Sequence, residues 1–162
     1  MKKVLSVLLI GLLSACASQT TQPTTDSGSA GAAGAAGSAA ALNPLRDPNN
    51  ILSKRSVYFD YDSYSVKDQY KSLVLAHAQY LRDNANAKVV LEGNADERGS
   101  REYNLALGQR RADSVRSVMT LSGAKEAQIE SVSLGEEKPR ASGQNEAAWA
   151  ENRRTDIRYQ GE

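Results

Sequence analysis

The sequence predicts an α+β domain in which strands and helices alternate in the order β-α-β-α-β-(short α)-β. Short runs rich in β-branched and aromatic residues, which are typical of strands, alternate with longer stretches whose apolar residues recur at helical spacing. A low-complexity stretch over residues 17–41, made mostly of Ser, Thr, Gln, Gly and Ala, precedes them. A chain of 162 residues, of which 40% are hydrophobic, suits one such domain, a sheet with helices against it.

The first strand is predicted over residues 56–59, after a short helical turn over residues 50–54. A polar and aromatic loop follows at residues 60–64. Ser63 or Ser65 can then cap a helix that ends near residue 83. The apolar face of this helix carries Val66, Tyr70, Leu73, Val74, His77, Tyr80 and Leu81, so we expect it to pack on the sheet. His77 is expected in the core, because no Cys or carboxylate lies at ligand spacing from it.

The second strand is predicted over residues 88–92, where a nearly continuous apolar run favours a buried position. Ser100 is the predicted N-cap of the second helix, and Glu102 lies in its first turn, where the helix dipole favours an anion. This helix is expected to run from Arg101 to Leu121 and to stop at Ser122-Gly123. Its apolar positions are Tyr103, Leu107, Val115, Val118 and Met119.

The last third of the chain predicts two more strands. A third strand is expected over residues 128–134, followed by a polar loop over residues 135–145. A short helix over residues 146–152 packs its Trp149 on the core. The final strand is expected over residues 155–159, where apolar and polar residues alternate.

The loop before the second helix and the helix itself supply opposite charges. Asp96 follows a predicted strand, where binding residues concentrate, and Arg111 lies near the apolar face of the helix. A carboxylate can receive an ammonium, and a guanidinium matches a carboxylate, so the pair can hold a zwitterion at both ends. The alternative is that Asp96 is solvated and Arg111 lays its stem over the core, the role expected for Arg110. We expect neither Asp96 nor Arg111 to belong to the core.

Several separated motifs occur in one order around this pair. Asp96-Glu97-Arg98-Gly99 precedes Asn104-x-x-Leu107-x-x-x-Arg111-Ala112-x-x-Val115. Val57-Tyr58-Phe59-Asp60-Tyr61-Asp62 lies upstream, and Gly135-Glu136-Glu137-Lys138-Pro139 and Asn152-Arg153-Arg154 lie downstream. Together they resemble the signature of OmpA-like domains over roughly residues 55–159. The resemblance implies a mixed sheet with helices packed on one face.

The resemblance also implies a ligand. In the family an Asp and an Arg at the positions of Asp96 and Arg111 bind meso-diaminopimelate in the peptidoglycan stem peptide. It further implies contributions from Tyr61 and Asp62, the latter through its backbone N–H. Which of Asp60 and Asp62 faces the ligand stays open.

Two residues of the second helix are implied to line the same pocket, namely Asn104 and Leu107. Asn104 can instead be structural, tying the loop to the helix. Glu97 and Arg98 are expected to form an ion pair that holds the loop, or to be solvated.

The N-terminus predicts export and lipidation. Lys2-Lys3 and the apolar run over residues 4–13 are typical of a secretory signal, and the run is shorter than the roughly 20 residues of a membrane span. The run ends in Leu13-Ser14-Ala15-Cys16, which resembles a bacterial lipobox, so Cys16 is expected to carry N-acyl and S-diacylglycerol groups. The alternative is that Cys16 is only a small apolar residue. Ala17, in place of Asp, implies no inner-membrane retention, hence an outer-membrane lipoprotein whose domain faces the periplasm.

These features divide the chain into three parts: a signal peptide at residues 1–15, a lipidated flexible linker at residues 16–45, and an OmpA-like peptidoglycan-binding domain at residues 46–162. The low-complexity linker cannot repay its ordering entropy and is expected to be a disordered tether. About 25 flexible residues have an r.m.s. span of roughly 25–30 Å.

Composition excludes several classes of function. The net charge of +1 gives no basic face for nucleic acid, and we expect none as a partner. One Cys and one His leave no ligand set for a typical zinc centre, so no metal or other cofactor is expected.

The resemblance implies a protein that is not an enzyme and that tethers the outer membrane to the wall. It also implies contact with the β-propeller protein and other components of the Tol system, with a role in envelope integrity and in constriction during division. Two alternatives remain open, a peptidoglycan-modifying enzyme and an interaction module that ignores the wall. Ser63 and Ser100 have no nearby His, which disfavours the enzyme.

Overall fold

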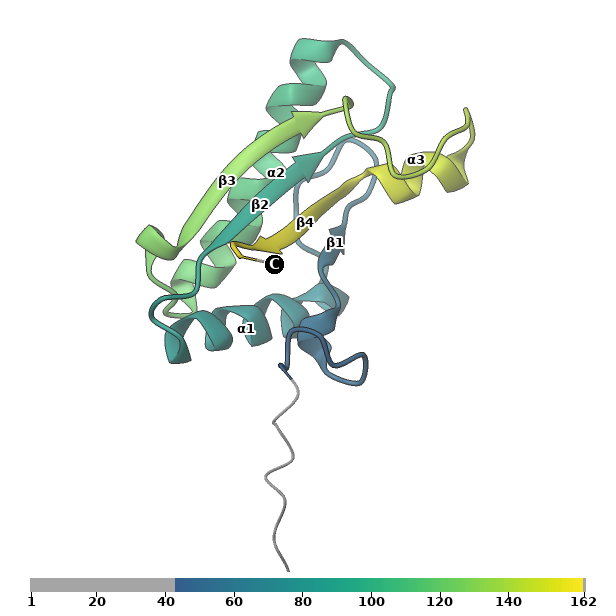
Figure 1. Ribbon diagram of the computed structural model, residues 1–162. Coiled ribbons are helices and arrows are strands. Elements are labelled where there is room, and N and C mark those ends of the chain that lie inside the picture. Colours follow the sequence, from purple (N-terminus) through teal and green to yellow (C-terminus); the bar gives the residue numbers. More distant parts are fainter. Residues whose placement is uncertain (1–42, 162) are drawn as a thin grey trace, which may run out of the picture. The chain divides into compact units, whose positions relative to one another are not determined.

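The computed structural model describes residues 43–161, and its elements follow the predicted order (Figure 1). The strands are β1 (Ser56–Tyr58), β2 (Val89–Asn94), β3 (Ile129–Gly135) and β4 (Arg154–Tyr159). The helices are α1 (Asp68–Asp83), α2 (Arg101–Leu121) and α3 (Glu146–Asn152), with short 3-10 turns η1 (Ile51–Ser53) and η2 (Glu126–Gln128). The predictions for the signal peptide, for Cys16 and for the linker up to residue 42 lie outside the described residues.

The four strands form one mixed sheet in the order β1-β4-β2-β3. β2 pairs with β3 in parallel, whereas β4 is antiparallel to both β1 and β2. The last strand of the chain therefore lies between the first and the second. This arrangement confirms the predicted α+β class and the mixed sheet.

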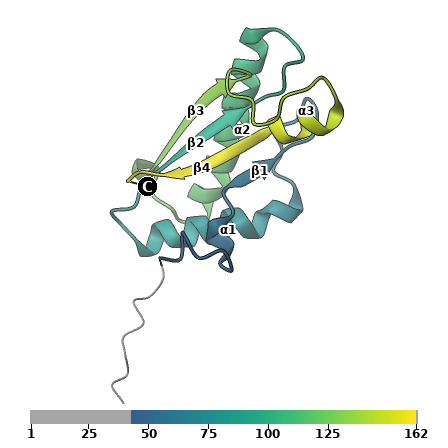
Figure 2. The same ribbon diagram turned by 45° about the vertical axis from the view of Figure 1, so that its right-hand side comes forward.

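The core lies between the sheet and the helices α1 and α2, which cover one face, while α3 lies just before the start of β4 (Figures 1 and 2). Alternate residues of the strands point into it, such as Val89 and Leu91 of β2. Tyr159 of β4 meets the rings of His77 and Tyr80 on α1, with centroids 5.8 Å and 5.3 Å away. The predicted apolar face of α1 thus packs on the sheet.

His77 belongs to this core, as predicted. It is fully buried, and its two ring nitrogens lie 2.9 Å from the Tyr159 hydroxyl and 2.9 Å from the Lys54 carbonyl oxygen. No group of His, Cys, Asp and Glu suited to a metal ion occurs among residues 43–161.

Helix α2 crosses β2 at a contact between two glycines. A Cβ atom built on Gly93 would lie 1.9 Å from the carbonyl oxygen of Gly108, so only glycine fits there. The backbone of the helix therefore rests against the strand at this point. Arg111, three residues after Gly108, is thereby carried to the end of β2.

The boundaries of α2 and α3 agree with the prediction, whereas α1 begins at Asp68 and not near Val66. Neither Ser63 nor Ser65 caps α1. The Ser63 Oγ instead accepts a hydrogen bond from the Ser65 N–H at 3.3 Å, and Lys67 is the residue before the helix. The chain from Asp60 stays non-helical because contacts from α2, described below, hold it.

The strand boundaries differ slightly from the predicted ones. β2 continues through Gly93 and Asn94, because these residues pair with β4 and β3. β1 ends at Tyr58, and the Phe59 N–H donates to the Arg153 carbonyl at 2.9 Å.

Candidate functional site

A pocket of about 160 Å³ lies where β2 ends and α2 begins. All six residues predicted to bind the ligand line it: Tyr61, Asp62, Asp96, Asn104, Leu107 and Arg111. Arg98 and Tyr103 are among its other lining residues. The structure therefore brings together side chains from the loop after β1, the loop after β2 and the first half of α2.

Arg111 forms the floor of this pocket and is 0% exposed. Its Nε, Nη1 and Nη2 donate to the main-chain carbonyls of Ser63, Asn94 and Asp60 at 2.8, 2.9 and 3.1 Å. One side chain thus ties the loop after β1 to the end of β2. The expectation that Arg111 lies outside the core is wrong, because it is the largest fully buried side chain among the described residues.

Within residues 43–161, no carboxylate forms an ion pair with the Arg111 guanidinium, although Asp96 lies nearby. Burial lowers its pKa to about 10, and the nearby Asp96 carboxylate acts in the opposite direction. A pKa of about 10 leaves the guanidinium protonated at neutral pH. Its hydrogen bonds go to carbonyl dipoles rather than to a carboxylate, so the pocket has a buried cation in its floor.

Asp96 is also buried, at 4% exposure, which corrects the expectation that it lies outside the core. Its Oδ2 lies 2.7 Å from Arg98 Nη2 and 3.3 Å from Arg153 Nη1, and its Oδ1 accepts from the Arg98 N–H and Nε at 3.1 Å. Burial raises the pKa of Asp96, but the hydrogen bonds from Arg98 and Arg153 outweigh burial, so its pKa is lowered. The carboxylate is therefore held ionised.

Arg98 closes one side of the pocket. Its guanidinium lies 4.2 Å from the centre of the exposed Tyr61 ring and 4.1 Å from the Trp149 ring, so it is sandwiched between two aromatic faces. The prediction of an ion pair between Glu97 and Arg98 is wrong, whereas the alternative of a solvated side chain fits Glu97, which is exposed. Arg98 pairs with Asp96, and Glu97 accepts a hydrogen bond from Trp149 Nε1 at 3.1 Å. Trp149 is half-buried and contacts this loop, so the prediction that it packs on the hydrophobic core is wrong.

Of Asp60 and Asp62, the two carboxylates left open by the sequence, Asp62 is the one that lines the pocket. Asp60 instead points to Lys67, whose Nζ lies 2.5 Å from its Oδ1, and it does not line the pocket. Asp62 has a φ of 52°, in the left-handed region, where a non-glycine residue is strained. Its carboxylate accepts a hydrogen bond from the Tyr103 hydroxyl, and this bond raises the pKa of Tyr103. Within residues 43–161 its backbone N–H donates to no protein group.

Asn104 and Leu107 complete the wall supplied by α2. Asn104 is buried, and its Nδ2 donates to the Glu136 carboxylate, which ties α2 to the turn after β3. The structural role foreseen for Asn104 is therefore present, though with a different loop from the one expected. Leu107 is nearly buried and gives the pocket its apolar side.

Three residues of the site were not singled out from the sequence. Tyr103 was counted among the apolar positions of its helix, yet it is half exposed and bonds to Asp62. Arg98 and Arg153 stand in the quoted motifs Asp96-Glu97-Arg98-Gly99 and Asn152-Arg153-Arg154, which was the available signal. Their convergence on Asp96 depends on the fold, because 57 residues separate Asp96 from Arg153.

Comparison with known proteins places this fold and site in a family. Residues 58–153 match the OmpA family, and the chain belongs to that family. Within it, the chain is similar to peptidoglycan-associated lipoproteins. It is 47% identical to that of Pasteurella multocida over 64% of this chain and 69% of the relative. It is 52% identical to that of Pseudomonas putida over 62% of this chain and 60% of the relative.

Solved structures agree with this placement. The peptidoglycan-associated lipoprotein of Burkholderia pseudomallei superposes with a TM-score of 0.72 at 58% identity, covering 73% of this chain and 100% of that chain. The C-terminal domain of Helicobacter pylori MotB, at 17% identity, shares the fold with a TM-score of 0.62 over 67% of this chain and 86% of that chain. Among the described residues, no helix has the length and apolar character needed to cross a membrane.

Proposed function

We propose that this protein is an outer-membrane lipoprotein that holds peptidoglycan without covalent chemistry, through the ammonium-carboxylate centre of meso-diaminopimelate. The relatives named peptidoglycan-associated lipoprotein support the wall as the ligand. The proposed anchor is a lipid group on Cys16, followed by a linker that lets the domain reach the wall. The protein then tethers the membrane to the wall.

The observation that carries this proposal is the buried cation of Arg111 beneath the pocket. A cation whose hydrogen bonds go to main-chain carbonyls and not to a carboxylate favours an anion above it, because charge effects are strong where water is excluded. A ligand carboxylate over Arg111 would supply that anion. The N–H of Asp62, which has no acceptor in residues 43–161, provides a direct donor to the same carboxylate. Arg111 acts from the floor through its charge.

The ammonium of the ligand is assigned to the acidic side of the pocket. Asp96 and Asp62 both line it, and both are already hydrogen-bonded, Asp96 to Arg98 and Asp62 to Tyr103. An ammonium can join these carboxylates, since each oxygen accepts more than one hydrogen bond. The Arg98 side chain, sandwiched between Tyr61 and Trp149, would then limit the space beside it.

The size of the pocket suits the end of one amino acid. Its volume of about 160 Å³ is below the roughly 300–1,000 Å³ that pockets for drug-sized molecules occupy. A second hollow of about 310 Å³ adjoins it and shares Asp62, Tyr103 and Leu107. The rest of the stem peptide would lie in this second hollow, beside Tyr64 and Arg110.

Membership of the Tol-Pal system is a further part of the proposal. The system's β-propeller protein and other Tol components would meet this domain on the membrane side of the wall. The role would be to keep the envelope intact and to help the outer membrane constrict at division. The similarity to peptidoglycan-associated lipoproteins is the support for this part.

The test is sedimentation of the domain with purified sacculi. Asp62→Gly is the sharpest variant, because it removes the carboxylate and suits the φ of 52°. Its matched control is Asp60→Ala, which removes a nearby carboxylate that does not line the pocket. We expect Asp62→Gly to reduce binding about tenfold and Asp60→Ala to leave it unchanged. Equal binding by the wild-type domain and both variants would contradict the proposal that this pocket binds peptidoglycan.

Two buried positions need conservative changes. Asp96→Asn and Arg111→Gln remove the charge of each side chain and are expected to weaken sedimentation. Circular dichroism checks that both variants remain folded. Two outcomes would favour other functions. Released muropeptides would indicate an enzyme, and wild-type domain that stays in the supernatant would indicate an interaction module without wall binding.

A further inference from the structure

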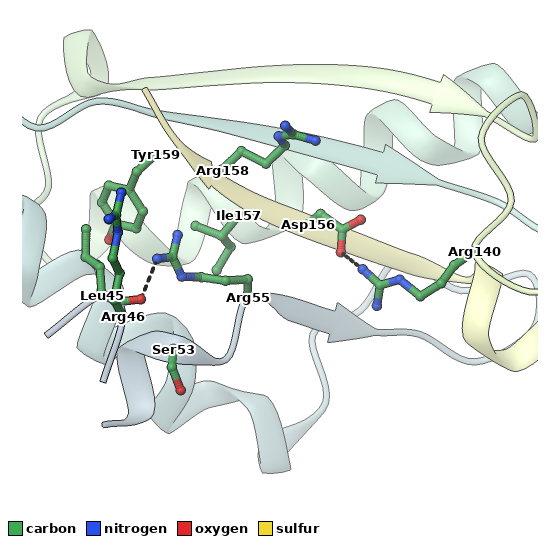
Figure 3. Close-up of a pocket in the computed structure, with 9 residues that line it drawn as sticks. All are labelled: Leu45, Arg46, Ser53, Arg55, Arg140, Asp156, Ile157, Arg158 and Tyr159. Atoms are coloured by element: carbon green, nitrogen blue, oxygen red, sulfur yellow. Dashed lines mark hydrogen bonds and ion pairs between the residues drawn. The ribbon is translucent and has the colours of Figure 1, made fainter. Parts of the chain in front are cut away.

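A third hollow, of about 480 Å³, lies along the outer edge of β4 and apart from the two described above (Figure 3). It exists because β1 covers only part of that edge, since Ser56, its first residue, pairs with Asp156. The hollow continues past Ile157 to Tyr159, beyond the reach of β1. We call it the arginine groove, after Arg46, Arg55, Arg140 and Arg158, which line it.

Two of these arginines are held in place. Arg55 donates from Nε to the Leu52 carbonyl at 2.7 Å and from Nη2 to the Leu45 carbonyl at 2.9 Å. Arg140 pairs through Nη2 with Asp156 at 2.7 Å, and its Nη1 donates to the Tyr58 hydroxyl at 2.8 Å. Their guanidinium groups are therefore fixed before any ligand arrives, which lowers the ordering cost of binding.

The other two arginines reach toward solvent. Arg46 is exposed, and the Arg158 side chain is 67% exposed, with Glu92 3.6 Å from its Nη1. Asp156 is the single carboxylate among the residues that line the groove. Four guanidinium groups therefore stand against two carboxylates, Asp156 and Glu92, so the groove keeps a positive charge. Figure 3 shows Arg140 paired with Asp156 and Arg158 directed over β2.

The groove runs along the edge of β4, from Arg140 beside α3 to Tyr159 at the end of the sheet that lies opposite the pocket. Tyr159, at the far end of the groove, pairs with Val89 at the start of β2, whereas the pocket follows the end of β2 at Asn94. Leu45 and Arg46, at the beginning of the described chain, form one wall of the groove. The linker therefore joins the domain beside the groove and away from the pocket.

We propose that the arginine groove binds the phosphate groups of membrane lipid headgroups and holds the domain on the membrane surface. Arginine forks match phosphate oxygens, and a cluster of them beside a membrane anchor attracts anionic lipid. This inference rests on the proposed lipid anchor at Cys16, which would bring headgroups to the linker end. The pocket would then face away from the membrane, toward the wall.

The experiment uses residues 43–162. All residues of the hydrophobic core lie within this part, and the Burkholderia pseudomallei relative that crystallised matches only 73% of this chain. Co-sedimentation is measured with phosphatidylcholine vesicles, with and without phosphatidylglycerol. We expect binding to the anionic vesicles alone. The Arg46→Ala/Arg158→Ala variant should bind about 30-fold more weakly, at about fivefold per arginine.

The matched control is Arg101→Ala/Arg116→Ala, which removes the same charge from two positions of α2 outside the groove, one exposed and one half-buried. An equal loss in this control would mean that net charge alone drives binding, and the groove would be wrong. Soluble glycerol phosphate that saturates the domain as readily as vesicles do would make a free phosphate the ligand. Binding of polyglutamate without binding of vesicles would make it an acidic peptide. Either outcome overturns the lipid proposal.

Sacculus sedimentation separates this proposal from the proposed function. Arg46→Ala/Arg158→Ala should keep full wall binding, because neither residue lines the pocket. Asp62→Gly should keep full vesicle binding. If the groove variant binds vesicles like wild type while Asp62→Gly loses sacculi, the lipid proposal alone fails.

Discussion

The pocket and the arginine groove hold their arginines in different ways. In the pocket, Arg111 is fully buried, and its donors join the loop after β1 to the end of β2. In the arginine groove, Arg46 and Arg158 are exposed. A buried guanidinium bonded to the main chain is part of the architecture, whereas an exposed one acts mainly on what comes near. Substitution of Arg111 should therefore cost stability, whereas substitution of Arg46 or Arg158 should cost only binding.

The largest expected effect tests this contrast directly. Arg111→Ala leaves three main-chain carbonyls without their donor and creates a cavity, so we expect a loss of about 3–5 kcal/mol in the free energy of unfolding. Arg158→Ala should change it by no more than about 0.5 kcal/mol. Urea denaturation measures both. Similar values for the two variants would break the comparison.

Gly93→Ala should be the next most damaging change. The added methyl group would lie 1.9 Å from the Gly108 carbonyl oxygen, so α2 must move off β2 at an expected cost of about 3 kcal/mol. Gly161→Ala is the control, because no atom lies within 4 Å of a Cβ there and only the φ of 92° opposes it, at about 1–2 kcal/mol. The ranking should reappear in thermal denaturation. If Gly93→Ala does not destabilise the protein, the contact between α2 and β2 near the pocket is less rigid than the structure implies.

The pocket should also confer a dependence of stability on pH. The pKa of Asp96 is lowered in the folded state, below the value near 3.9 of an unfolded chain, so the unfolded state takes up the proton more readily. Its contribution to stability is present above about pH 4 and is lost as the pH falls through the folded pKa. Unfolding measured from about pH 6 to about pH 2 should therefore show falling stability. Asp96→Asn should flatten this slope, and an unchanged slope would assign it to other carboxylates.

The smallest effect is spectroscopic. Trp149 is the only Trp of the chain, and its ring lies 4.1 Å from the Arg98 guanidinium beside the pocket. A diaminopimelate-containing stem peptide should change its fluorescence by a small but saturable amount. Anionic vesicles should change it less, because Trp149 does not line the arginine groove. A response to vesicles and not to peptide would contradict the assignment of the peptide to the pocket and of the lipid to the arginine groove.

The elements that the sequence predicted best are those with local causes. Ser100 accepts from the Tyr103 N–H at 3.2 Å as a cap should, and α2 spans the predicted residues. The six expected site residues surround one pocket, because a strand end and a helix start bring their neighbours together. The pattern and the family resemblance were enough for this much.

What the sequence did not reveal depends on contacts between distant segments. Helix α1 starts late because Arg111 of α2 donates hydrogen bonds to the carbonyls of Asp60 and Ser63. These bonds hold the preceding chain in a non-helical conformation.

The burial of Asp96 and Arg111 was missed because charged residues are rarely buried without partners. Arg153, which bonds to Asp96, and the carbonyls that bond to Arg111 lie in distant segments. No periodicity signals the contact between Gly93 and Gly108.

The position of β4 has a consequence for how the protein is made. Because residues 154–159 fill the gap between β1 and β2, the sheet stays in two unjoined pieces until nearly the whole polypeptide is available. A partly synthesised chain cannot complete the sheet, because β1 and β2 pair with β4 and not with each other. Maturation is therefore deferred until the carboxyl-terminal segment has arrived.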